Sequence, residues 1–126
     1  MKWIVIFHTD FVPEFYELSA TVQDELYAQT RVLERFGPTL GRPHVDTLEG
    51  SKYPNMKELR FNADNGVWRV AFGFDLERKA VLLVGGNKSG VSSKRFYKGL
   101  IKKADARMDS HFAMLEENKS KKKGRS

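Results

Sequence analysis

The chain has 126 residues, a formal net charge of +6 at pH 7 and no cysteine. This length suits one domain that folds without covalent staples. The lack of thiols excludes disulfides, cysteine nucleophiles and thiolate metal sites, and it suits a reducing compartment. No apolar run reaches the roughly 20 residues that cross a bilayer, so we expect a cytoplasmic protein with no membrane partner.

The first part of the chain predicts one strand and two helices. Residues 2–7 are rich in β-branched and aromatic side chains, which favour a strand rather than a signal peptide. A short helix is expected over residues 9–17, and Thr21 is expected to cap a longer helix over residues 22–36. Residues 38–55 contain several glycines and prolines and are expected to form a loop.

The second part predicts three strands and a final helix. The strands are expected at residues 57–61, 67–74 and 79–84, with the third nearly all apolar and therefore central. The turn at residues 64–66 ends in a glycine, which is expected to adopt the positive φ that a hairpin turn requires. The final helix is expected to begin after Ser92 or Ser93 and to end near residue 117.

The order strand-helix-helix-strand-strand-strand-helix predicts an α+β fold. We expect a small twisted sheet, mainly antiparallel, with an N-terminal helical hairpin on its apolar face and a C-terminal helix. The folded domain is expected to cover residues 1–117. The Lys-rich residues 118–126 have nothing to bury and are expected to form a disordered basic tail.

Charge is unevenly distributed along the chain. Residues 1–50 carry a net −4, residues 51–107 a net +8 and residues 108–126 a net +2. This pattern favours one face suited to a polyanion. A solvated basic face without any ligand would give the same pattern.

Familiar cofactor motifs are missing from the sequence. The run Gly-Gly-Asn-Lys-Ser at residues 85–89 has the wrong glycine spacing for a phosphate-binding loop. His8, His44 and His111 are far apart and have no clustered second ligand. We therefore expect neither a metal site nor a cofactor.

A group of cationic side chains remains as the candidate site. Strand alternation sends Arg60 and Arg69 away from the core, onto one face of the sheet. Lys88 follows the third predicted strand in a glycine loop, and Tyr97 lies at the start of the last helix. A solvated strand arginine and a core tyrosine are the alternative interpretations of these residues.

Arg, Lys and Tyr can in principle cleave RNA. The 2′-hydroxyl attacks the adjacent phosphate, which requires a base, cations on the developing charge and an acid for the leaving oxygen. Arginine binds phosphate oxygens in pairs. Lysine or tyrosine can transfer protons where nearby positive charge lowers the pKa.

Several stretches of the sequence are distinctive when taken together. They are LGRP at 40–43, VDTLEGS at 45–51, NMKELR at 55–60, WRVAFGFD at 68–75, VLLVGGNKSG at 81–90 and KRFY at 94–97. In this order the chain resembles the RelE/HigB toxin superfamily, in its phage-derived HigB-like branch, over about residues 1–116. The KELR strand and the GNKS loop in combination are the most specific part of this resemblance.

The resemblance implies a RelE-like fold and a toxin of a type II toxin–antitoxin system. Such a toxin is an mRNA interferase, a metal-independent endoribonuclease that cuts mRNA on the ribosome and inhibits translation. A HigA-like antitoxin with a helix-turn-helix would be its protein partner. The implied catalytic residues are Arg60, Arg69, Lys88, Tyr97 and Lys57. The implied RNA-binding residues are Lys94, Arg95, Lys98 and Lys102.

Alternatives remain at the level of the site and of the function. RelE carries a basic residue where this chain has Glu58, so Lys57 is the nearest candidate base, and His44 with Glu58 forms an alternative acid–base pair. A ParE-like toxin acting on gyrase would share the fold. A non-catalytic, basic nucleic-acid-binding phage accessory protein would share the charge.

Overall fold

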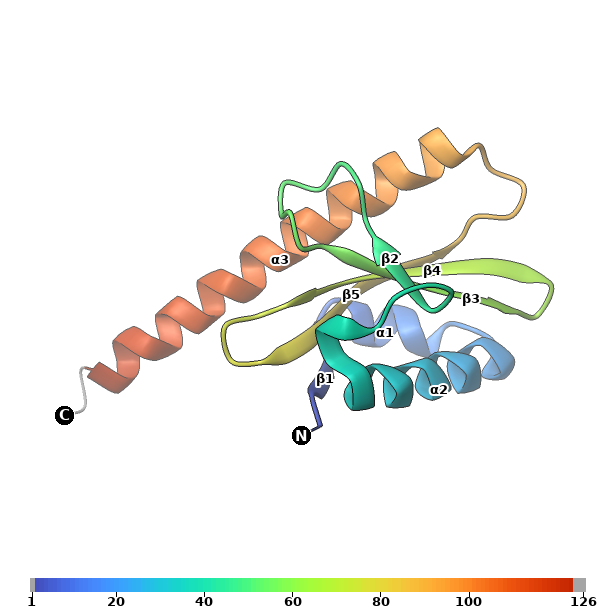
Figure 1. Ribbon diagram of the computed structural model, residues 1–126. Coiled ribbons are helices and arrows are strands. Elements are labelled where there is room, and N and C mark those ends of the chain that lie inside the picture. The colour runs from blue at the N-terminus through green and yellow to red at the C-terminus, as the bar shows by residue number, and fades with distance from the viewer. Residues whose placement is uncertain (1, 124–126) are drawn as a thin grey trace.

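The computed structural model describes residues 2–123, which form one sheet with helices on both faces (Figure 1). The elements in chain order are β1 (Ile4–Phe7), α1 (Phe11–Tyr16), α2 (Ala20–Phe36), the short 3-10 turn η1 (Gly37–Thr39), β2 (Val45–Thr47), β3 (Lys57–Ala63), β4 (Gly66–Phe74), β5 (Lys79–Asn87) and α3 (Ser93–Lys123). No helix within residues 2–123 combines the length and the apolar character needed to span a membrane.

The five strands lie in the order β1-β5-β4-β3-β2. Neighbouring strands are antiparallel, except that β1 runs parallel to β5. This confirms the α+β class and the mainly antiparallel sheet. The apolar β5 lies inside the sheet between β1 and β4, but the central strand is β4.

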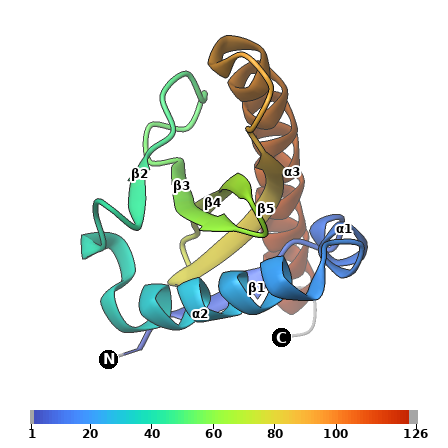
Figure 2. The ribbon, with the colours of Figure 1, turned by 90° about the vertical axis from the view of Figure 1, so that its right-hand side faces the viewer.

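The helical hairpin covers one face of the sheet, as predicted (Figure 2). Phe11 and Phe15 of α1 pack with Leu26 and Leu33 of α2 in one buried cluster. The sheet contributes buried side chains that alternate along its strands: Val45, Leu59, Phe61, Val70, Phe72, Ala80 and Leu82. Each large side chain fully buried in this way contributes about 1.5–3 kcal/mol of transfer free energy.

The opposite face is covered by α3. Leu100, Ala104 and Met108 pack on a second buried cluster that includes Val81 and Leu83 of β5. Small residues allow the helix to approach the sheet closely. A Cβ added at Gly73 would lie 3.0 Å from Cε of Met108. The sheet is therefore a middle layer, with a helix layer on each face.

One ion pair and one His–Asp contact join distant segments around this core. Arg107 of α3 donates to both carboxylate oxygens of Glu14 on α1, at 2.7 and 2.6 Å, and to the carbonyl of Leu83 at 2.8 Å. Nε2 of His111 lies 2.8 Å from Oδ2 of the fully buried Asp75 carboxylate, at the turn between β4 and β5. Both pairs attach α3 to the rest of the domain.

Some local predictions were wrong. The N-cap of α2 is Ser19, whose hydroxyl accepts from the backbone N–H of Val22 at 3.3 Å, so Thr21 lies inside the helix. The predicted loop at 38–55 contains β2, which forms the edge of the sheet. This strand is only three residues long, too short for alternation to reveal it.

The hairpin turn and the tail also differ from expectation. Positive φ values occur at Asp64 (50°) and Asn65 (59°), not at Gly66. Gly66 instead provides space, because an added Cβ would lie 2.8 Å from Nδ2 of Asn87. The final helix does not end near residue 117 but continues to Lys123, so residues 118–123 are helical rather than disordered. Residues 124–126 of the predicted tail lie outside the described residues.

Candidate active site

The carboxylate of Glu58 is the centre of a buried polar cluster between β3, β4 and α3. Its Oε1 accepts from Nη1 of Arg60 at 2.7 Å and from the hydroxyl of Tyr97 at 2.9 Å. Nε of Arg69 lies 3.4 Å from the same oxygen, close enough for an ion pair but without hydrogen-bond geometry. The Glu58 and Arg69 side chains are only 4% and 8% exposed.

Strand register brings these groups together. Arg60 pairs with Arg69 across β3 and β4, and Glu58 pairs with Ala71. Side chains two residues apart share a face of a strand, so Glu58, Arg60 and Arg69 all lie on the face that α3 covers. Like charges directly opposite each other repel, and the Glu58 carboxylate offsets that repulsion.

Alternation correctly predicted the shared face of the two arginines, but not their surroundings. Arg69 is buried, and its Nη1 donates to the carbonyl of Trp68 at 2.8 Å. Arg60 is half-buried, with 21% of its side chain exposed. Arg69 is therefore not an outer-face residue, because α3 closes over this side of the sheet.

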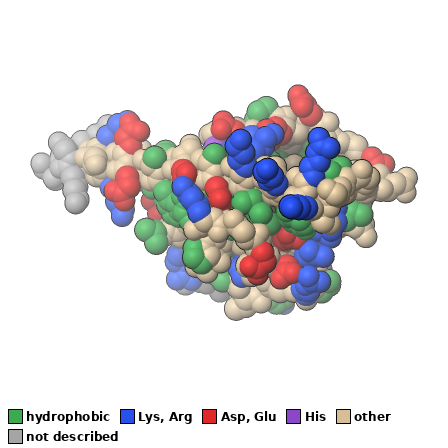
Figure 3. Space-filling view, turned by 90° about the horizontal axis from the view of Figure 1, so that it is seen from above, with side chains coloured by type: hydrophobic (Ala, Val, Ile, Leu, Met, Phe, Trp, Pro, Cys, Tyr) green, Lys and Arg blue, Asp and Glu red, His purple; other side chains and the backbone are tan. Residues whose placement is uncertain are grey.

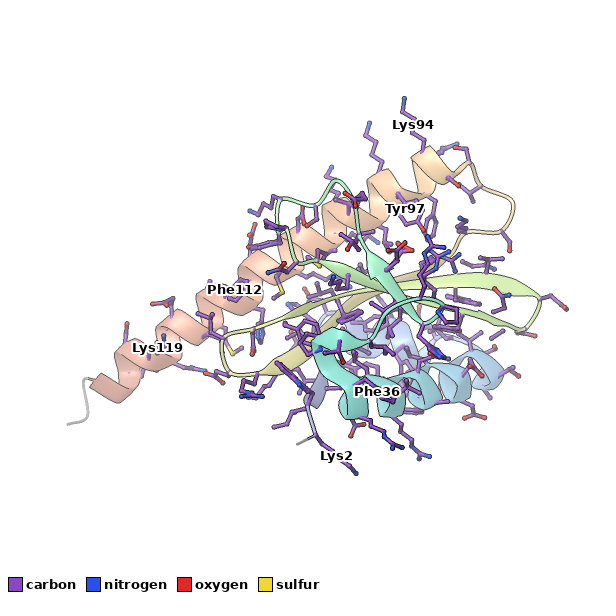
Figure 4. The ribbon with its side chains drawn as sticks, viewed as in Figure 1. Lys2, Phe36, Lys94, Tyr97, Phe112 and Lys119 are labelled. Atoms are coloured by element: carbon purple, nitrogen blue, oxygen red, sulfur yellow. The ribbon has the colours of Figure 1, made fainter. Side chains whose placement is uncertain are left out.

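Tyr97 closes the cluster from above, with its side chain pointing from α3 towards the sheet (Figure 4). Burial raises the pKa of the Tyr97 hydroxyl, and the hydrogen bond to the Glu58 carboxylate raises it further. The hydroxyl thus stays protonated at neutral pH and acts as a donor. Nζ of Lys88 lies 5.6 Å from the centroid of the Tyr97 ring, a cation–π contact that adds Lys88 to the group.

A pocket of about 300 Å³ opens beside this cluster. Glu58, Arg60 and Tyr97 line it together with residues of β2 and its flanking segments, namely Arg42, Asp46, Thr47, Leu48 and Glu49. A carboxylate, two guanidinium groups, a phenol and an ammonium thus meet near an open pocket. These groups can bind an anionic phosphate and move a proton.

Two other candidates lie outside the cluster. Lys57 shares its strand face with Leu59 and not with Glu58, and its Nζ lies 3.4 Å from Oγ1 of Thr47. His44 contacts Gln29 of α2, with 3.2 Å between Nδ1 and Oε1. The structure therefore brings neither Lys57 nor His44 into hydrogen-bond contact with the Glu58 carboxylate.

The four predicted RNA-binding residues, Lys94, Arg95, Lys98 and Lys102, are all exposed on the first half of α3. Lys94 points away from the sheet, in the opposite direction to Tyr97 (Figure 4). Figure 3, which looks onto the α3 side, shows Lys and Arg side chains gathered over the half of this face where α3 begins. The cluster thus lies beneath a basic surface.

Sequence reasoning gave no role to one pair in the pocket wall. Nε and Nη2 of Arg42 both donate to Oδ2 of Asp46, at 3.0 and 2.6 Å. The available signal was that Arg42 lies in the distinctive stretch at 40–43 and Asp46 in the one at 45–51. Within residues 2–123 there is also no group of three or more His, Cys, Asp or Glu placed to hold a metal ion.

Comparison with known proteins gives consistent matches. The family described as "Phage derived protein Gp49-like (DUF891)" matches residues 13–109. Two Mycobacterium tuberculosis proteins described as candidate toxins are each 41% identical to this chain. The match to HigB2 extends over 113 residues, 89% of this chain and 52% of HigB2. The match to HigB3 extends over 99 residues, 79% of this chain and 84% of HigB3. The chain thus spans about half the length of HigB2 and most of HigB3.

Two solved structures share the fold. A variant of the Escherichia coli toxin RelE in the free state superposes with a TM-score of 0.60 at 16% identity, covering 85% of this chain and 98% of RelE. A chain of the Pyrococcus horikoshii RelE–RelB complex gives a TM-score of 0.52 at 19% identity, covering 72% of this chain and 100% of that chain. Together these matches confirm the resemblance found in the sequence: the chain has the fold of RelE, resembles HigB toxins at 41% identity and belongs to the phage-derived Gp49-like family.

Proposed function

We propose that this chain is the toxin of a toxin–antitoxin pair and that it cleaves RNA at the Glu58 cluster. The observation that carries the proposal is the buried Glu58 carboxylate, held by Arg60, Arg69 and the Tyr97 hydroxyl at the edge of a pocket under a basic surface. A buried charged cluster is costly unless its members are well paired, so it stabilises the fold weakly at best. Perturbed titratable groups beside a pocket are typical of functional sites.

The cluster contains each group that the reaction needs. Glu58 accepts the proton of the 2′-hydroxyl, whose oxygen then bonds to phosphorus. Arg60 and Arg69 bind the phosphate oxygens as negative charge develops. The bond from phosphorus to the 5′-oxygen breaks, and the ammonium of Lys88 gives that oxygen a proton. Tyr97, which stays protonated, orients the Glu58 carboxylate.

The substrate that fits best is mRNA on the ribosome. The exposed residues Lys94, Arg95, Lys98 and Lys102 give α3 a surface for phosphates next to the cluster. A HigA-like helix-turn-helix antitoxin is the expected partner, and the RelE–RelB complex is one example of a protein of this fold bound to a partner. Action on ribosomes requires a cytoplasmic location.

Expression of the full chain tests the proposal. We expect growth arrest, rescue by the antitoxin, and mRNA fragments that begin with a 5′-hydroxyl. Glu58→Gln removes the base, and we expect cleavage on programmed ribosomes to fall by about a hundredfold or more. Glu17→Gln is the matched control, because Glu17 is exposed beyond the end of α1, and we expect it to cleave normally.

Three results would contradict the proposal in different ways. Full cleavage by a folded Glu58→Gln variant would place the site elsewhere. Intact mRNA together with altered DNA supercoiling would favour the gyrase-directed alternative. Normal growth at high levels of folded wild-type protein would show that the chain is not a toxin.

A further inference from the structure

The β2–β3 loop, residues 48–56, forms part of the pocket beside the Glu58 cluster. Leu48 and Glu49 line that pocket together with Thr47, the last residue of β2. The two ends of the loop are joined by a hydrogen bond from the backbone N–H of Leu48 to the carbonyl of Met56, at 2.9 Å. Both of these residues are buried in the cluster beneath α3. The tip of the loop lies outside that cluster, so its position depends on other contacts.

Those contacts come from two acidic side chains of α3. Asp105 accepts one hydrogen bond at each carboxylate oxygen. Its Oδ1 accepts from the Ser51 hydroxyl at 2.5 Å, and its Oδ2 accepts from the backbone N–H of Lys52 at 3.1 Å. The Ser51 hydroxyl oxygen in turn accepts from the backbone N–H of Tyr53 at 3.0 Å. One carboxylate thus fixes three successive residues of the loop.

Asp109, one turn further along α3, adds weaker contacts. It accepts from the ammonium of Lys52 at 2.6 Å and from the Tyr53 hydroxyl. The Lys52 and Asp109 side chains are 56% and 46% exposed, and water and salt screen ion pairs of this kind. Burial raises the pKa of Tyr53 to about 12, and the hydrogen bond to Asp109 also raises it, so the hydroxyl stays a donor at neutral pH. Ser51 and Asp105 are half-buried, so we expect Asp105 to hold the loop more firmly than Asp109.

The two carboxylates belong to a row of side chains on α3 that also reaches the Glu58 cluster. Side chains four residues apart lie on one face of a helix, and the members of this row are Tyr97, Ile101, Asp105 and Asp109. Tyr97 donates to Glu58 at one end of the row. Ile101 lies against the loop, because a Cβ added at Gly50 would be 3.4 Å from its Cδ1. One face of one helix therefore sets the positions of the cluster and of the loop relative to each other.

We propose that Asp105 is a positioning residue for the cleavage reaction, which holds the β2–β3 loop against α3 and so keeps residues 47–49 in place at the pocket. The inference rests on the proposed ribonuclease function. The groups proposed to move the proton and to bind the phosphate come from β3, β4, α3 and the segment after β5, and none comes from this loop. Release of the loop should therefore weaken RNA binding and leave the chemical step nearly unchanged.

Single-turnover cleavage of mRNA on programmed ribosomes separates binding from chemistry. Asp105→Ala removes both acceptors, and we expect the protein concentration at half-maximal rate to rise about tenfold, because only molecules with a held loop bind well. The maximal rate should stay within about twofold of the wild-type rate, whereas Glu58→Gln lowers it. Ser51→Ala breaks the same contact from the loop and should give the same result. The double variant should therefore be no worse than either single variant.

Trypsin reports the state of the loop without any RNA. Lys52 is exposed, but cutting after it requires the backbone to leave Asp105. Because cutting follows the population of the open form, we expect Asp105→Ala and Ser51→Ala to be cut there about tenfold faster than the wild type. Asp105→Asn keeps an oxygen for the Lys52 N–H and gains an amide that can donate to the Ser51 hydroxyl. It should restore most of the slow cutting and most of the tight binding.

Glu14→Ala is the matched control. It removes the ion pair that attaches the same helix to α1, so it loosens α3 at a place away from the loop. We expect the wild-type concentration at half-maximal rate and the wild-type rate of cutting after Lys52.

The outcomes separate this inference from the proposed function. Wild-type trypsin resistance in Asp105→Ala, or faster trypsin cutting with an unchanged half-maximal concentration, would overturn the positioning role. Equal rises in that concentration in Glu14→Ala and Asp105→Ala would overturn it too, since any loosening of α3 would then suffice. A fall in maximal rate as large as that of Glu58→Gln would show that Asp105 takes part in the chemistry, which also overturns it. Failure of the wild-type chain to cut RNA would instead overturn the proposed function, and trypsin would still show whether Asp105 holds the loop.

Discussion

The face of the sheet beneath α3 consists of two different halves. Near the middle of the helix, Leu100, Ala104 and Met108 pack on apolar strand residues. Near its start, Tyr97 lies over a carboxylate and two guanidinium groups. One helix thus covers both a hydrophobic core and a charged cluster, only a few residues apart.

The difference shows what each half contributes. Burial of apolar side chains stabilises the fold in proportion to the area removed from water. Burial of charged groups costs free energy that their pairing offsets only in part. The apolar half holds α3 in place, and the attached helix in turn keeps water away from the Glu58 cluster. Changes in the two halves should therefore have different effects.

The largest effect on stability is expected in the apolar half. Leu83→Ala removes a fully buried side chain, and we expect the free energy of unfolding to fall by about 2–5 kcal/mol, since a cavity remains. Leu76→Ala is the matched control, because Leu76 is 83% exposed and should change stability by less than about 0.5 kcal/mol. Urea unfolding of both variants checks the contrast. Similar values would show that α3 is not held by this contact.

The two arginines of the polar half should separate stability from activity. Arg69→Ala leaves a buried carboxylate with one partner fewer, and we expect about 1–3 kcal/mol of lost stability. Arg60 is more exposed than Arg69, so Arg60→Ala should lower the free energy of unfolding by less than Arg69→Ala does. Both variants should lose about a hundredfold in cleavage rate if the arginines stabilise the phosphate. Thermal melting beside cleavage assays decides this, and equal stability losses would contradict the difference in burial.

Tyr97→Phe removes one hydroxyl and leaves the ring in place. The lost hydrogen bond to the Glu58 carboxylate should cost about 1 kcal/mol of stability. Because folding raises the pKa of Tyr97, its contribution is present below the ordinary pKa of 10.0 and is lost as pH rises through the raised value. The wild-type protein should therefore lose more stability than Tyr97→Phe at strongly alkaline pH. If the wild type and Tyr97→Phe lost stability equally as the pH was raised, this expectation would be wrong.

The Glu14–Arg107 pair should contribute less to the stability of the fold, and its contribution should depend on pH. Hydrogen bonds from Arg107 lower the pKa of the Glu14 carboxyl below its ordinary value of 4.5. Stability from this pair is present above the ordinary value and is lost as pH falls through the lowered one, from about pH 5 downward. Glu14 is 39% exposed, so we expect about 1 kcal/mol or less. As the pH is lowered below about 5, the melting temperature of Glu14→Gln should fall less than that of Glu17→Gln.

Truncation after Glu117 should have the smallest effect on stability. The side chains at positions 118–121 are exposed, so the melting temperature should hardly change. The truncation removes five positive charges, which should weaken RNA or ribosome binding and reduce its salt dependence. Binding measured at two salt concentrations checks this. A large fall in melting temperature would show that the end of α3 supports the fold.

Local patterns predicted much of this architecture. Alternation placed Arg60 beside Arg69 on one face, and the end of α2 at residue 36 was predicted as observed, because both signals depend only on neighbouring residues. The resemblance favoured Lys57, but in the structure Lys57 lies on the other face of β3 from Glu58, together with Leu59. Glu58 was predicted only as half of an alternative acid–base pair with His44. Its position at the centre of the cluster was not predicted, because it depends on how α3 docks on the sheet, a contact between distant segments.

The connection of β1 to β5 has a consequence for the synthesis of the protein. Ile4 pairs with Lys79, and Glu14 pairs with Arg107, 93 residues later in the chain. The first strand therefore has no sheet partner until β5 has left the ribosome, and Tyr97 reaches Glu58 only after that. Because contacts between distant segments form late, the nascent chain completes its charged cluster only after the first turns of α3 have been synthesised.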